Sequence, residues 1–264
     1  MMRGPLLFGA WLATQVGTAP ASVPTVAWAE ELRLRSLADV DNVLTLPLGE
    51  MPDAVMEDQT VRSIRTCKDI LAILKLKFTL SPDNRISWDS LESESVRCLA
   101  LDVLKTAKPA SSSFLGGFHF SAATVFRLPV RFALVFSDDQ EKLLVKAEAA
   151  CTSWAKYDPS LRVRVKGEEG TVTTDGWTGR IVQYARGDLD GDGIEDLMFL
   201  REGEVTGGTA ALSTLFIVTQ TSAKSCLRVI RTLPESLGMG PPREATVAQP
   251  RARALSGSKR PIQR

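Results

Sequence analysis

Apolar residues recur with a helical period in two segments of the first half of the chain. The clearer segment is DSLESESVRCLALDVLKTA, residues 89–107, where Asp89 or Ser90 can cap the start of a helix. Its apolar stripe, spaced by three and four residues, consists of Val96, Leu99, Ala100, Val103, Leu104 and Ala107. A shorter helix is predicted in residues 66–77, where Thr66 and Asp69 suit a helix start. The first half therefore predicts a helical hairpin after a loop-rich lead-in.

In the second half of the chain, apolar residues tend to recur at every second position, as is typical of strands. Alternating or short apolar runs occur at residues 161–168, 179–185, 196–200, 213–220 and 226–233. Residues 124–136, TVFRLPVRFALVF, also suggest a strand, although Pro129 favours an edge or a break. Residues 137–157 indicate a helix with Ser137 and Gln140 at capping-box spacing, and a hairpin at SDDQ is the alternative.

Together these patterns predict an α+β fold, in which an N-terminal helical hairpin precedes an antiparallel β-sheet subdomain with one helix. KPASSSFLGG, residues 108–117, has the composition of a linker and places a soft boundary there. We expect a signal peptide at 1–29, a lead-in and helical subdomain at 30–110, and a mainly antiparallel β subdomain at 111–237. The remaining residues, 238–264, are basic, lack a core pattern and predict a disordered tail.

The N-terminus has the layout of a secretory signal peptide. Arg3 precedes an apolar run at residues 5–13, and Ala27-Trp28-Ala29 predicts cleavage between Ala29 and Glu30. Ala19-Pro20-Ala21 is the second option. The apolar run is shorter than the roughly 20 residues that span a bilayer, so a membrane anchor is the weaker interpretation. The sequence thus predicts a secreted or periplasmic protein with no membrane span after cleavage.

Composition narrows the class of partner. The chain has 264 residues with 44% hydrophobic and 24% charged residues, which is ordinary for a soluble globular protein. A net charge of +1 and an aromatic content of 6% argue against nucleic acid as a partner. The partner is otherwise unknown, and export would bring the protein to envelope or extracellular proteins.

The cysteine count agrees with export. There are four cysteines without a C-x-x-C spacing, so zinc and dithiol redox chemistry are disfavoured. An oxidising compartment would pair them in one of three ways. We favour Cys67–Cys98 and Cys151–Cys226, because each pair then lies within one predicted subdomain.

An acidic loop, ARGDLDGDGIEDLMFL at residues 185–200, carries the most specific chemical signal. Asp188, Asp190, Asp192 and Asp196 repeat at spacings that offer oxygen ligands to one hard cation, and the carbonyl of Ile194 falls between the last two. Gly193 follows the third carboxylate, where the chain must bend around the ion. Because no His or Cys is nearby, this ligand set predicts Ca²⁺ rather than zinc or copper.

The loop resembles two known calcium-binding patterns. Its first positions resemble an EF-hand or dockerin loop, but position twelve is Phe199 where that pattern needs an acid. GDLDGDGIEDLMF is more similar to the calcium loop of FG-GAP and VCBS-type repeats, which joins two strands. That resemblance implies a strand–loop–strand element with Asp188, Asp190, Asp192, Ile194 and Asp196 as ligands. Those families build β-propellers from several repeats, and a single copy here predicts that the protein is not a β-propeller.

Two other features of this region receive no function from the sequence. Glu195 is expected to point away from the ligand positions. The triplet Arg186-Gly187-Asp188 matches an integrin-binding motif, but we interpret it as the junction of a strand with the loop, because Asp188 is a predicted ligand.

No catalytic arrangement stands out. His119, the only histidine, lies between two phenylalanines and is interpreted as a structural strand residue. The chain has no G-x-S-x-G nucleophile motif and no phosphate-binding loop. The sequence favours an exported, non-enzymatic protein with a structural calcium loop. The alternative is an envelope or secreted hydrolase that uses calcium structurally, which a deep pocket holding His119 would favour.

Overall fold

The computed structural model describes residues 25–80, 88–207 and 211–234. An antiparallel sheet forms the centre of the fold, with strand order β10-β9-β8-β7-β6-β5, and the short β1 pairs with β7 beside this path. These strands are β1 (Ala27–Trp28), β5 (Arg162–Lys166), β6 (Glu169–Thr173), β7 (Trp177–Gly187), β8 (Asp196–Val205), β9 (Ala211–Thr219) and β10 (Arg228–Leu233). The predicted α+β class is confirmed, and the described residues form no propeller.

Both faces of the sheet are buried. Alternate residues of the central strands contribute to two separate hydrophobic clusters, as the two-residue period of a strand requires. Val182, Met198 and Leu200 belong to the cluster shared with the first half of the chain. Leu197 and Phe199 belong to the cluster on the opposite face. Consecutive apolar residues in β8 are therefore explained by a strand that is covered on both sides.

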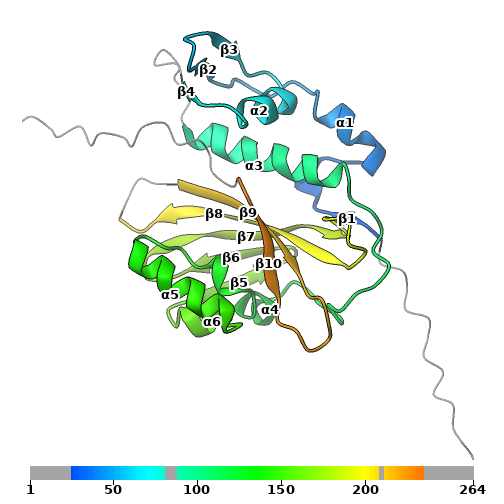
Figure 1. Ribbon diagram of the computed structural model, residues 1–264, viewed down its shortest axis with the longest axis vertical. Helices are drawn as coiled ribbons and strands as arrows, with labels where there is room; N and C mark the ends of the chain where they lie inside the picture. Colours follow the sequence, from blue (N-terminus) through cyan, green and yellow to red (C-terminus); the bar gives the residue numbers. More distant parts are fainter. Residues whose placement is uncertain (1–24, 81–87, 208–210, 235–264) are drawn as a thin grey trace, which may run out of the picture.

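The first half of the chain covers one face. Its elements are η1 (Glu30–Leu32), η2 (Leu37–Asp39), α1 (Val40–Val43), β2 (Asp53–Met56), β3 (Val61–Ser63), α2 (Cys67–Ile73), β4 (Phe78–Leu80) and α3 (Trp88–Leu104). The long helix α3 lies across the sheet (Figure 1). The reciprocal capping box of Thr66 and Asp69 confirms the predicted start of α2. Asp89 and Ser90 lie within α3 rather than at its cap, because the helix begins at Trp88.

The predicted lead-in contains more structure than its sequence indicated. Strands β2, β3 and β4 form a second, three-stranded antiparallel sheet with β2 in the middle. Each is only three or four residues long, so none contains enough alternation to be recognised from the pattern alone.

The opposite face carries helices, of which the sequence predicted only one. They are α4 (Ala122–Phe126), η3 (Val130–Phe132), α5 (Asp138–Ala149) and α6 (Trp154–Tyr157), and they lie below the sheet in Figure 1. The strand predicted at residues 124–136 is wrong. Ser121 and Thr124 form a capping box that starts α4, which buries Val125. Leu128, in the turn after α4, and Phe132, in η3, are buried in the same cluster.

The predicted helix in residues 137–157 is confirmed at its start and ends early. Ser137 caps α5 by accepting a hydrogen bond from the backbone N–H of Gln140, so the alternative hairpin at SDDQ is wrong. The helix ends at Ala149 because Cys151 takes a left-handed conformation with φ of 55°. Cys151 therefore does not continue the apolar face of the helix.

Both favoured disulfides are confirmed. Cys67–Cys98 joins α2 to α3, and Cys151–Cys226 joins the end of α5 to the segment before β10. In the part of the chain that the structure describes, no helix is both long and apolar enough to cross a bilayer. The predicted basic tail, 238–264, and most of the predicted signal peptide lie outside the described residues.

Candidate metal centre

The acidic loop connects β7 to β8, two neighbouring antiparallel strands, as the resemblance implied. Gly191 and Gly193 take φ values of 91° and 84°, which side chains with a Cβ rarely adopt. The predicted bend at Gly193 is therefore present, and a second bend lies at Gly191. The two glycines bend the loop tightly, which allows carboxylates of the loop to approach one another.

Three of the four aspartates come together. Asp188, Asp190 and Asp196 each offer a carboxylate oxygen, and these three oxygens lie within 4.8 Å of one another. Asp188 and Asp196 are buried, whereas Asp190 is exposed. Asp192 lies outside this group, and its Oδ1 accepts a hydrogen bond of 2.7 Å from the backbone N–H of Ile194. The carbonyl ligand at Ile194 stays a prediction.

Backbone N–H groups hold these carboxylates in place. Asp188 accepts from Gly191 N at 2.7 Å through Oδ1 and from Gly193 N at 3.1 Å through Oδ2. Asp190 Oδ1 accepts from Asp192 N at 3.0 Å. These short-range hydrogen bonds are typical of aspartates in tight turns, and they fix each carboxylate before any ion binds.

Asp196 is the strongest indication that the loop suits a cation. Its Oδ2 accepts from Leu189 N at 3.0 Å, whereas its buried Oδ1 makes no well-formed hydrogen bond among the described residues. Burial raises the pKa of Asp196 to about 6, and the charges of Asp190 and Asp192 act in the same direction. The hydroxyl of Thr219, at the paired position of β9, lowers the pKa of Asp196 but does not offset burial. Desolvation and the charges of Asp192 and Asp188 also raise the pKa of Asp190. The folded loop therefore disfavours its own ionised carboxylates unless a cation is present.

The segment of residues 108–113, which we call the strap, holds the loop from the side. Lys108 and Asp188 exchange two backbone hydrogen bonds, of 3.0 and 2.9 Å. Farther along, Ser111 N and Ser112 N donate to the carbonyl of Gly193 at 2.9 and 3.2 Å. The strap therefore supports the acidic loop, although its sequence has the composition of a linker.

Glu195 has a role that the sequence did not reveal. One oxygen of its buried carboxylate pairs with Arg186, at 2.8 Å from Nε and 2.7 Å from Nη2. The other oxygen accepts a hydrogen bond of 2.6 Å from the hydroxyl of Ser113. Glu195 therefore points away from the aspartates, as expected, but links the loop to β7 and to the strap. Arg186 is also occupied by this ion pair, which is a further reason not to interpret the Arg-Gly-Asp triplet as an adhesion motif.

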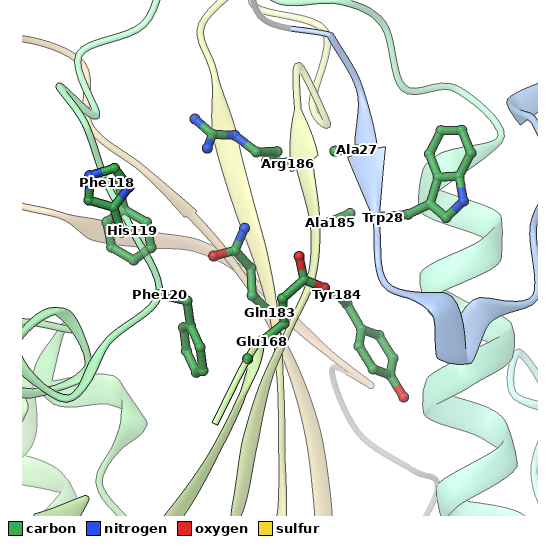
Figure 2. A pocket seen from close by; sticks show the side chains of 11 residues that line it. Ala27, Trp28, Phe118, His119, Phe120, Glu168, Gln183, Tyr184, Ala185 and Arg186 are labelled. Atoms are coloured by element: carbon green, nitrogen blue, oxygen red, sulfur yellow. The ribbon is translucent and has the colours of Figure 1, made fainter. Parts of the chain in front are cut away.

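A cavity of about 280 Å³ lies near this end of β7, where β1 replaces β6 as its neighbour (Figure 2). Its lining includes Phe118, His119, Phe120, Glu168 and Gln183. The interpretation of His119 as a strand residue is wrong, because it is exposed in the irregular segment before α4. The lining contains one imidazole and one carboxylate but no serine, threonine or cysteine nucleophile.

The site and fold together define an α+β protein with a carboxylate cluster in a strand–loop–strand element. Comparisons with protein-family models, with curated proteins and with solved structures found no match to this chain. The similarity to FG-GAP and VCBS-type loops therefore depends on the loop alone.

Proposed function

We propose that this chain is an exported, non-enzymatic protein in which the loop between β7 and β8 binds calcium as a structural ion. The observation that carries the proposal is Asp196, whose buried Oδ1 makes no well-formed hydrogen bond among the described residues and which is grouped with Asp188 and Asp190. A buried carboxylate oxygen without a hydrogen bond is costly, and a bound cation removes that cost.

The ligand chemistry supports calcium over other metals. All candidate ligands are oxygens, which hard cations prefer, whereas zinc and copper prefer nitrogen or sulfur. Ca²⁺ takes about six to eight oxygen ligands in flexible geometry, whereas Mg²⁺ demands a near-ideal octahedron and keeps several waters, so a loop that offers several carboxylates favours Ca²⁺. The carboxylate oxygens of Asp188, Asp190 and Asp196 lie within 4.8 Å of one another, close enough for one Ca²⁺ to bind all three.

A structural role follows from the position of the loop. The loop joins the two central strands of the sheet and is hydrogen-bonded to the strap, which continues from the end of α3. An ion held there would fix the ends of β7 and β8 and the strap at the same time. Any ligand that binds the folded state alone raises its stability by mass action.

Calorimetric titration of EDTA-treated protein with CaCl₂ tests the proposal. We expect one site with a Kd in the millimolar range or tighter, a higher melting temperature with Ca²⁺, and weaker binding of MgCl₂. Asp188→Asn should reduce the affinity strongly, whereas Asp175→Asn, at an exposed aspartate in the β6–β7 connection, should leave it unchanged. Absence of Ca²⁺ binding at millimolar concentration in the wild-type protein would overturn the proposal.

Export is supported by the two disulfides, since such bonds persist in oxidising compartments. The leader-like sequence before Ser22 or Glu30 is the second support. Fractionation of expressing cells, with the protein found outside the cytoplasm and fully oxidised, is the expected result. Free thiols on a cytoplasmic protein would contradict it.

A second candidate function, a hydrolase with structural calcium, is favoured by one observation. His119 lies on a cavity wall with Glu168 rather than in a filled core, so a general base and an acid are available beside an open space. A panel of ester, peptide and glycoside substrates should reveal activity that His119→Ala and Glu168→Gln abolish and Glu204→Gln retains. The absence of turnover by the calcium-loaded wild-type protein would remove this candidate.

A further inference from the structure

Strand β1 lies within the segment that was predicted to be removed as a signal peptide. Ala27 pairs with Arg186 of β7, and Trp28 pairs with Ala185. The next residue, Ala29, continues the pairing by donating its backbone N–H to the carbonyl of Tyr184 at 2.7 Å. The strand therefore extends the central sheet directly beside the start of the acidic loop.

The side chains of this segment are part of the fold as well. Ala29 is only 4% exposed and belongs to the core cluster on the α3 side of the sheet. Trp28 packs against the same cluster, and its Nε1 donates to the carbonyl of Leu34 at 3.1 Å. Figure 2 shows β1 alongside β7, with the indole of Trp28 directed away from His119 toward α3.

Val26 connects this segment to the end of β7. A Cβ added to Gly187 would lie 3.1 Å from Cγ2 of Val26, so the Val26 side chain covers the glycine that precedes Asp188. Ala27 and Trp28 also line the cavity that contains His119. Cleavage between Ala29 and Glu30 would remove the strand, a core residue, the cover of Gly187 and part of the cavity wall together.

We propose that the leader is cleaved after Ala21, so that the mature protein begins at Ser22 and retains β1. This proposal depends on the proposed export of the protein. Ala19-Pro20-Ala21 supplies the small residues that a signal peptidase requires three positions and one position before the cut. Ala27-Trp28-Ala29 has the same spacing, but its residues belong to the folded sheet.

N-terminal sequencing and intact mass of the protein exported by a bacterial host expressing the full chain test the proposal. A mature N-terminus at Ser22 is expected. An N-terminus at Glu30 overturns this proposal and leaves export intact, whereas an uncleaved chain in the cytoplasm overturns both. The two failures are therefore distinguishable.

A matched pair of substitutions sharpens the result. Ala21→Tyr places a large residue directly before the proposed cut and should abolish the Ser22 terminus. Ala27→Tyr alters an exposed residue three positions before the other cut, and processing should continue as in the wild type. The reverse result, with Ala27→Tyr blocking cleavage and Ala21→Tyr having no effect, contradicts the proposal.

Stability gives an independent readout. Chains expressed without a leader, starting at Ser22 or at Glu30, should differ in melting temperature by roughly 5 °C or more, with the longer chain more stable. Equal melting temperatures would mean that β1 is dispensable, and the physical reason for retaining it would be gone.

Discussion

Replacing Asp196 with asparagine should stabilise the metal-free protein at neutral pH and abolish its response to calcium. Asn has the same shape as Asp, and its carbonyl oxygen can still accept the hydrogen bond from Leu189 N that Asp196 Oδ2 accepts now. Its amide can donate to the neighbouring carboxylates of Asp188 and Asp190, where Asp196 places a repelling charge. The substitution removes a buried negative charge and one metal ligand in a single step.

The size of the effect follows from the pKa of Asp196. Burial raises this pKa from 3.8 to about 6 in the metal-free fold. A difference of about 2 pKa units corresponds to about 3 kcal/mol at 1.36 kcal/mol per unit. Because the folded protein holds this proton more tightly than the unfolded chain, the metal-free wild type loses stability as the pH rises from about 4 to about 6. The full loss is present at pH 7, and Asp196→Asn should recover up to that amount.

Thermal and urea unfolding at pH 5 and pH 7, each in EDTA and in excess CaCl₂, measures the four combinations. In EDTA the wild type should be more stable at pH 5 than at pH 7, and the variant should show a smaller difference. At pH 7 a gain of about 3 kcal/mol corresponds to roughly 6–12 °C in melting temperature for a chain of this size. Calcium should raise the melting temperature of the wild type and leave that of the variant unchanged.

Asp175→Asn is the matched control, because Asp175 is exposed and distant in sequence from the loop. It should change neither the pH dependence nor the calcium response. Our reasoning is refuted if Asp196→Asn destabilises the protein in EDTA at pH 7, or if the variant keeps the calcium response of the wild type. The first outcome would mean that the buried charge is already compensated, and the second that Asp196 is not a ligand.

Three further substitutions test packing, an ion pair and a disulfide in the fold. Gly203→Ala should cost about 1–3 kcal/mol in urea unfolding, because the new Cβ would lie 2.5 Å from the carbonyl oxygen of Thr178, whereas Gly49→Ala has open space and should be near neutral. Glu195→Gln should cost about 2–3 kcal/mol by the same measurement, since it weakens a buried charge-assisted pair, and an unchanged midpoint would contradict that role. Replacing both Cys151 and Cys226 with serine should lower stability by about 2–4 kcal/mol under oxidising conditions, and the difference from the wild type should disappear in reductant.

Long, strictly periodic elements could be predicted from the sequence. Helix α3 contains most of an apolar stripe of about three turns, and the central strands of the sheet have runs that match their two covered faces. Short elements could not be predicted in the same way. Residues 124–136 contain enough β-branched and aromatic residues to resemble a strand, and only the Ser121–Thr124 capping box distinguishes them as the start of a helix.

The carboxylate cluster of the acidic loop was predictable because its aspartates are close in sequence. Asp188, Asp190 and Asp196 meet through local turns, and the spacing itself encodes the geometry. The supports of the loop are distant in sequence and could not be predicted. Ser113 reaches Glu195 across 82 positions, and the pairing of β1 with β7 joins residues that the sequence assigned to a removable leader and to a folded domain.

The position of the loop explains how the proposed calcium site would affect the whole fold. The chain leaves α3 on one face of the sheet, passes the loop as the strap, and continues to α4 on the other face (Figure 1). The strap and the ends of β7 and β8 therefore meet where the chain passes from one face of the sheet to the other. An ion in the loop would stabilise this junction rather than one isolated turn.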